Sequence, residues 1–107
     1  CAWYAIWETM AYLQLGEGEK ALAKLEWLST QTGVFSELFE IYERGMRPWF
    51  TTAEGAFIHA VDRLLLPEET SGIPPAWSAG WENFSFRLCS STGKILDMES
   101  RNRQWKQ

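Results

Sequence analysis

The sequence predicts a mainly α-helical fold, in which helical hairpins are followed by a short antiparallel β-hairpin. Three segments in the first two thirds of the chain carry apolar residues at the spacing of a helix. Near the C-terminus the apolar spacing changes to two, which is typical of a strand with one covered face. A connector rich in Pro, Gly and Ser separates the two parts. We therefore expect helices in 1–66, a connector in 67–80, and a β-hairpin with a tail in 81–107.

The first two helices are predicted to form a hairpin with an inner and an outer member. Residues 2–15 carry apolar side chains around nearly the whole circumference of the helix, which indicates that protein surrounds it. Gly16 ends this helix. Residues 19–31 are apolar on one face and charged on the other, as in a helix at the surface.

A long connection and a third helix follow. Residues 34–50 show no clean period and are dense in aromatic and charged side chains, and such long loops in compact domains are usually functional. Thr51, three residues before Glu54, predicts a capping box at the start of the third helix, which Pro67 stops. Small residues in its first turns predict that another backbone approaches closely there.

The β-hairpin is predicted from alternation. Residues 83–88 and 94–99 are expected to pair antiparallel through a turn at 90–93, with Phe84 and Phe86 buried. Two strands alone are only marginally stable, so a larger sheet or the helices must cover their apolar face.

Composition and charge exclude several classes of function. The net charge is −4 and no basic stripe is visible, so we expect no nucleic-acid partner. No apolar run is long enough for a membrane span. His59 is the only histidine and is expected to be a packing residue, while Cys1 and Cys89 lack metal spacing and are expected to be free, buried thiols. We therefore predict no metal and no cofactor, and the cellular compartment stays undecided.

The chain opens abruptly on an apolar helix. Residues 1–7 resemble the middle of a buried helix, which favours a piece of a longer protein over a lipid-anchored N-terminus. Seven Trp, six Phe and three Tyr exceed what a small core requires. Some of these rings are expected to face a cleft, another chain or the rest of a parent enzyme. Alone in solution, the chain is expected to aggregate, to stay molten or to associate with other chains.

Residues 48–61, 73–77 and 80–86 resemble segments at the end of six-hairpin glycosidases, the family of α/α toroids that includes α-fucosidase and the maltose and cellobiose phosphorylases. Residues 48–61 are similar to the final inner helix of these toroids, and 73–77 with 80–86 are similar to the opening of their C-terminal β-domain. The resemblance implies the last hairpins of an (α/α)6 toroid and a carbohydrate substrate. It also implies glycoside hydrolysis by paired carboxylates, with this chain inactive by itself.

The resemblance also implies where the site residues lie. In similar enzymes the general base often sits in the loop before the last inner helix, which here holds Glu37, Glu40 and Glu43. Glu37 is the first candidate because its apolar neighbours would partly desolvate it, and Glu40 is the second. Glu43 is expected to pair with Arg44. The candidates for substrate binding, which are sugar platforms and a polar clamp, are Tyr42, Arg47, Trp49 and Phe50.

A non-catalytic α-helical interaction module is the alternative function. Stacked helical hairpins also build protein-binding solenoids. Against this reading, the hairpins show no repeat of fixed period, and a terminal β-hairpin is foreign to such arrays.

Overall fold

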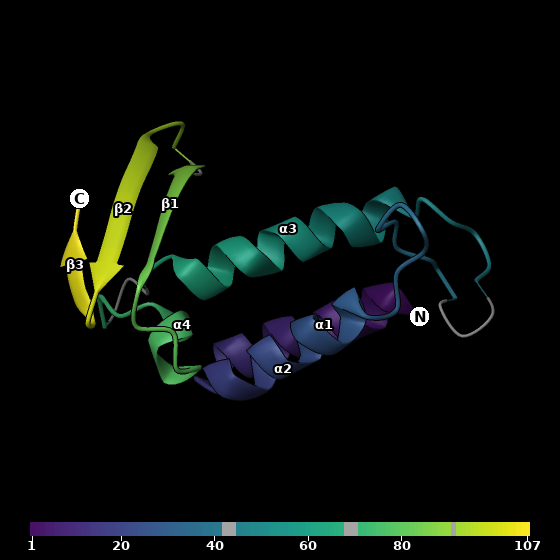
Figure 1. Ribbon diagram of the computed structural model, residues 1–107, viewed down its shortest axis with the longest axis horizontal. Coiled ribbons are helices and arrows are strands. Elements are labelled where there is room, and N and C mark those ends of the chain that lie inside the picture. The colour runs from purple at the N-terminus through teal and green to yellow at the C-terminus, as the bar shows by residue number, and fades with distance from the viewer. Residues whose placement is uncertain (42–44, 68–70, 91) are drawn as a thin grey trace.

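The computed structural model describes residues 1–41, 45–67, 71–90 and 92–107. These residues form four helices and three strands. The helices are α1 (Ala2–Gln14), α2 (Gly18–Ser29), α3 (Thr51–Leu65) and the short α4 (Pro75–Ser78), and the strands are β1 (Phe84–Cys89), β2 (Ile95–Arg101) and β3 (Gln104–Lys106). The three long helices lie side by side, the sheet stands at one end of them, and α4 lies between (Figure 1). The order of helices followed by antiparallel strands confirms the coarse fold prediction.

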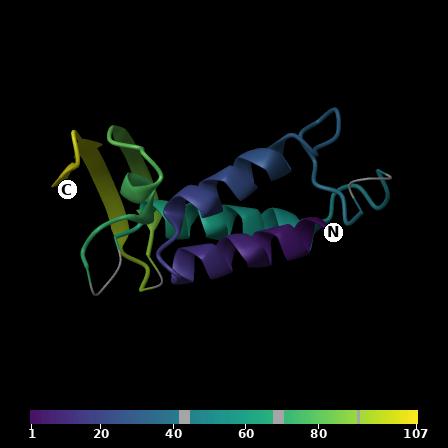
Figure 2. The same cartoon turned by 90° about the horizontal axis from the view of Figure 1, so that it is seen from below.

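Helix α1 is the centre of the helical layer. It contacts α2 and α3 extensively, whereas α2 and α3 barely touch each other. Its inward face buries Ala5, Ile6, Thr9 and Leu13, and the buried hydroxyl of Thr9 donates a hydrogen bond to the carbonyl of Ala5. Figure 2 shows the three helices from below, with α1 and α2 forming the predicted hairpin.

The outward face of α1 is exposed in the described chain, so the prediction that protein surrounds this helix is not met by the chain itself. The side chains of Tyr4 and Trp7 are 58% and 54% exposed. Among the described helices and strands, α2 and α3 make the main contacts with α1. The one-sided character of α2 is confirmed, since Ala21, Leu25 and Leu28 are buried.

The apolar core consists of two clusters along the helices. The larger one joins all three long helices and takes in Leu38 from the connection between α2 and α3; its members are Ala2, Ala5, Ile6, Leu25, Leu28, Leu38, Ala53 and Ala60. The smaller one lies toward the sheet and consists of Leu13, Ala21, Leu64 and Ala76. Alanines are frequent in both clusters, and they allow the helix backbones to approach closely.

The start of α3 differs from the prediction. The N-cap is Phe50 and Thr51 is already helical, with its hydroxyl donating to the carbonyl of Trp49, so the expected capping box does not form. The small residues in the first turns of α3 differ in their burial. Ala53 is buried in the larger cluster, whereas Gly55 faces open space and needs no close approach of a backbone.

The sheet has the order β1-β2-β3, and all its strands are antiparallel. The predicted pairing of β1 with β2 is confirmed, with Phe84 opposite Ser100 and Leu88 opposite Leu96. The third strand was not predicted. Phe84 and Phe86 are half-buried rather than buried, because the sheet projects away from the helices and Phe84 alone reaches the smaller cluster.

A buried hydroxyl ties the sheet to α4. The indole Nε1 of Trp77 donates to Ser100 Oγ at 2.9 Å, and Ser100 Oγ in turn donates to the carbonyl of Glu82 at 2.8 Å. The ring centroids of Trp77 and Trp105 lie 5.6 Å apart. Since Ser100 is fully buried, these two hydrogen bonds satisfy a group that would otherwise cost stability.

Two glycines give a matched test of the helical packing. A Cβ at Gly18 would overlap the Pro75 carbonyl and the Ser78 hydroxyl, whereas a Cβ at Gly55 would meet nothing within 4 Å. We expect Gly18→Ala to lower the free energy of unfolding by about 1–3 kcal/mol, because overpacking forces backbone shifts. Gly55→Ala should raise it by about 0.5–1 kcal/mol, as expected in an exposed helix. Urea unfolding measures both, and equal effects of the two changes would contradict this close contact of α2 with α4.

Candidate functional site

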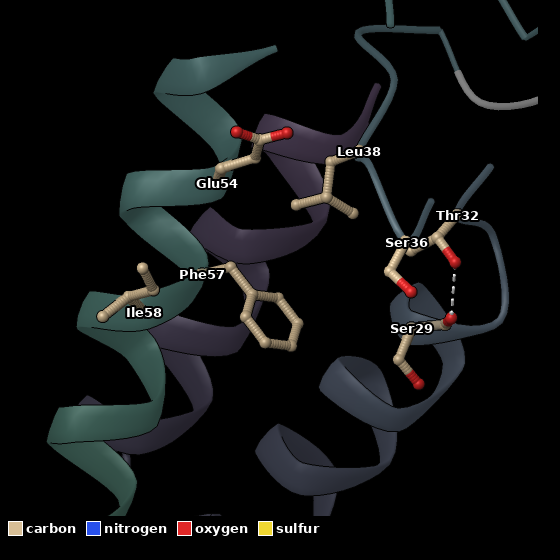
Figure 3. A pocket seen from close by; sticks show the side chains of 7 residues that line it. All are labelled: Ser29, Thr32, Ser36, Leu38, Glu54, Phe57 and Ile58. Carbon is tan, nitrogen blue, oxygen red and sulfur yellow. Dashed lines mark hydrogen bonds between the residues drawn. The ribbon is translucent and has the colours of Figure 1, made fainter. Parts of the chain in front are cut away.

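A groove lies between α3 and the C-terminal end of α2 with the turn that follows it. Its volume is about 350 Å³. One wall is made by α3 and the other by α2 and the following connection, and the side chains that line it are Ser29, Thr32, Ser36, Leu38, Glu54, Phe57 and Ile58 (Figure 3). Each wall combines polar and apolar groups, with Leu38 beside the hydroxyls on one side and Glu54 beside Phe57 and Ile58 on the other, so the groove suits a ligand with both polar and apolar faces.

Glu54 supplies the carboxylate of this groove. It lies in the first turn of α3, where the unpaired N–H groups of the helix favour a negative charge. Its Oε1 atom is buried and has no hydrogen-bond partner among the described residues. A buried polar atom without a partner is costly, and such atoms are common where a ligand completes the site. The spacing of Thr51 and Glu54 predicts a helix cap and gives no sign of this position in the groove.

The apolar wall and the hydroxyls come from different elements. Phe57 and Ile58 follow Glu54 by one helical turn, so all three lie on one face of α3. Across the groove, the Thr32 hydroxyl donates to the carbonyl of Ser29 at 3.2 Å. Ser36 stands beside them with a backbone φ of +63°. The run of Glu, Phe and Ile at spacings of three and four was the sequence signal that could have located this wall.

Glu37, the first predicted catalytic residue, is half-buried in the turn before Leu38. Its Oε2 accepts a hydrogen bond from the Phe35 N–H at 2.8 Å. The side chain is not among those that line the groove, although its neighbours Ser36 and Leu38 are. Its assignment as a general base stays a prediction.

Glu40 and Arg47 are brought together as an ion pair, with Arg47 Nη1 2.5 Å from Glu40 Oε2. Their backbones are also joined, since Glu40 N–H donates to the Arg47 carbonyl and Ile41 bridges to Met46. Neither side chain lines the groove. Tyr42 and Glu43 lie outside the described residues, as does Arg44, the expected partner of Glu43.

The two predicted aromatic platforms differ in their exposure. Trp49 is 58% exposed and adopts a φ of +59°. Phe50 is half-buried, packs against the larger core cluster and meets the ring of Trp3 edge-on at 6.5 Å. Trp49 is therefore available to a ligand or partner, whereas Phe50 is chiefly a core residue at the start of α3.

Other ionisable groups lie apart from the groove. His59 is exposed, so its expected packing role is wrong, and Cys89 is exposed rather than buried. The pKa of Lys20 is raised because its ammonium donates a hydrogen bond to Glu17 at the start of α2. Within the described part of the chain, no group of three or more His, Cys, Asp and Glu residues could hold a metal ion. Likewise, no helix there is both long and apolar enough to cross a bilayer.

Comparison with known proteins gives no relative for this chain. No protein-family model, no curated protein and no solved structure matches it.

The unpartnered oxygen of Glu54 leads to a test of stability. Replacing Glu54 with Met removes a carboxylate atom that lacks a partner among the described residues and retains an unbranched side chain of similar length. We expect Glu54→Met to raise the free energy of unfolding by roughly 1 kcal/mol in the absence of ligand. Glu26→Met, at an exposed position of α2, is the matched control and should change stability little. Chemical denaturation that shows a loss of stability in Glu54→Met would contradict the assignment.

Proposed function

We propose that this chain is part of a carbohydrate-active enzyme and that the groove between α2 and α3 binds a sugar. The observation that carries the proposal is Glu54 in the groove wall, beside hydroxyls and a phenyl ring, with a buried Oε1 that has no partner among the described residues. A sugar matches this lining because its hydroxyls donate to carboxylates while its C–H face packs against an aromatic ring. The volume of about 350 Å³ is at the small end of ligand sites.

Hydrolysis requires more than this groove offers. Glycosidases that act on O-glycosyl bonds use two carboxylates, separated by about 5–5.5 Å in retaining enzymes and about 6.5–9.5 Å in inverting ones. Glu54 is the single acid among the described residues that line the groove. In this proposal the second carboxylate comes from protein outside the chain, in the manner of the toroid enzymes that the sequence resembles. The chain by itself binds a sugar without cleaving it.

Binding is tested by titrating the ¹⁵N-labelled chain with neutral α- and β-linked glucose oligomers. We expect one class of oligomer to shift the amide signals of Thr32, Ser36 and Phe57, with no release of reducing sugar. Glu54→Gln should weaken binding about tenfold or more, because a hydrogen bond to a charged group contributes about 1.5–3 kcal/mol. Glu26→Gln should bind like the wild-type chain. Failure of every oligomer to shift these signals, or an unchanged affinity in Glu54→Gln, would refute the proposal.

The exposed face of α1 favours a second candidate function, a helical interaction module. The rings of Trp3 and Trp7 lie 4.7 Å apart and those of Tyr4 and Trp7 5.6 Å apart, so the aromatic side chains form a continuous row. Exposed rows of this kind are frequent at protein interfaces.

Sedimentation velocity tests this second candidate. The wild-type chain should associate as its concentration rises, and Trp7→Gln should shift the equilibrium toward the monomer, because it removes apolar area from the row. Gln14→Ala, at an exposed position on the same helix, serves as the control. A wild-type chain that stays monomeric at all concentrations and unfolds in one sharp transition would speak against the interaction module.

A further inference from the structure

The turn between residues 33 and 37 is closed by the side chain of Glu37. Ser36 N–H donates to the Gly33 carbonyl at 3.0 Å, and Gly33 N–H donates to the Glu37 carbonyl at 3.0 Å. Between these two bonds, Glu37 Oε2 accepts from the Phe35 N–H at 2.8 Å. The carboxylate is thus folded back onto its own turn and holds the amide at the apex.

Glycine at position 33 makes room for this carboxylate. A Cβ at Gly33 would overlap all three atoms of the Glu37 carboxylate group. The turn therefore depends on Gly33, which leaves space for the carboxylate, and on Glu37, whose carboxylate fills that space.

Apolar burial does not hold the apex of this turn. Val34 is 93% exposed and Phe35 is 76% exposed, so neither side chain anchors the turn to the core. Ser36 adopts a φ of +63°, which is unfavourable for a residue with a Cβ. The hydrogen bond from Phe35 N–H to the Glu37 carboxylate is charge-assisted and is correspondingly strong. It offsets the strain that the turn carries.

The turn sets two parts of the groove wall. Ser36 and Leu38, the neighbours of Glu37 on either side, both line the groove. Leu38 is also buried in the larger core cluster, and its carbonyl accepts from Phe50 N–H at 3.1 Å, which connects it to the start of α3. Ser36 is connected to the core cluster and to α3 through the turn at 33–37.

We infer that Glu37 is a positioning residue: its carboxylate fixes the turn at 33–37 and thereby sets the Ser36 hydroxyl in the groove wall opposite α3. This role differs from that of a general base, which would need the carboxylate inside the groove. The part of the inference that concerns the ligand rests on the proposed sugar site. The part that concerns the turn does not.

Two substitutions separate positioning from catalysis. Glu37→Gln keeps an oxygen that accepts from Phe35 N–H, whereas Glu37→Ala removes it. In hydrogen exchange measured by NMR, the Phe35 amide should be protected in the wild type and in Glu37→Gln and should exchange about tenfold faster in Glu37→Ala. Gly33→Ala should have the same effect as Glu37→Ala, because its Cβ displaces the carboxylate without changing it chemically. An exchange rate of the Phe35 amide that is the same in Glu37→Ala and the wild type would overturn the inference, whatever the sugar data show.

The same variants connect the turn to the groove. Glucose-oligomer affinity should be unchanged in Glu37→Gln and should fall severalfold in Glu37→Ala, with the Ser36 amide signal displaced. Loss of affinity in Glu37→Gln with a protected Phe35 amide would overturn the positioning role and favour direct contact of Glu37 with the ligand. If no oligomer binds the wild-type chain, the proposed function fails, and the exchange rates still decide the role of Glu37.

Discussion

The packing of α1 against its two neighbours is the contact on which the rest of the structure depends. Residues of α1 belong to both core clusters, and α2 and α3 are held together mainly through it. Small side chains allow this arrangement: Ala2 and Ala5 on α1 share a cluster with Ala53 and Ala60 on α3. Without the close approach of α1 and α3, helix α3, which carries Glu54 and Phe57, would lose its main packing contact. The groove wall formed by α3 adjoins this packing, because Phe57 lines the groove and also packs against the larger core cluster.

The connection between α2 and α3 is anchored by backbone hydrogen bonds and by the buried side chain of Leu38. Ala2 N–H donates to the Glu40 carbonyl, and Phe50 N–H donates to the Leu38 carbonyl. These bonds connect the loop to the first turns of α1 and α3, where unpaired N–H groups are available. The loop can therefore present exposed residues such as Phe35 and Trp49 without losing its position on the helices. An ordered loop with exposed aromatic rings is a frequent arrangement at binding sites.

The elements with a strong period were predictable from the sequence, and those governed by local chemistry were not. Apolar spacing located the long helices and the β1–β2 pair within one or two residues at most ends. β3 was missed because it is three residues long and carries one apolar side chain, Trp105, which alternation cannot detect. Its place in the sheet comes from contact of Trp105 with Phe84 and Phe86.

The candidate site was only partly accessible to sequence reasoning. The loop before α3, where the sequence predicts the site residues, contributes Ser36 and Leu38 to the groove. The sequence could not distinguish the roles of the acids in this loop. A hydrogen bond between a side chain and its own turn, as in Glu37, does not change the spacing of apolar residues. Glu54 fitted a capping pattern equally well in sequence, and only the position of the N-cap at Phe50 separates the two roles.

The sheet has a property that concerns handling of the protein rather than its function. β3 pairs with β2 only at Glu99, Ser100 and Arg101, so the segment 95–98 is paired on the β1 side alone among the described strands. Open strand edges act as templates for further strands, and a refolding chain at high concentration can extend such a sheet into a fibril. The exposed ion pair between Arg87 and Asp97 lies next to this edge and places charge where an added strand would have to dock. Because salt screens surface charge, fibril formation by this chain should be faster in concentrated salt than in dilute buffer.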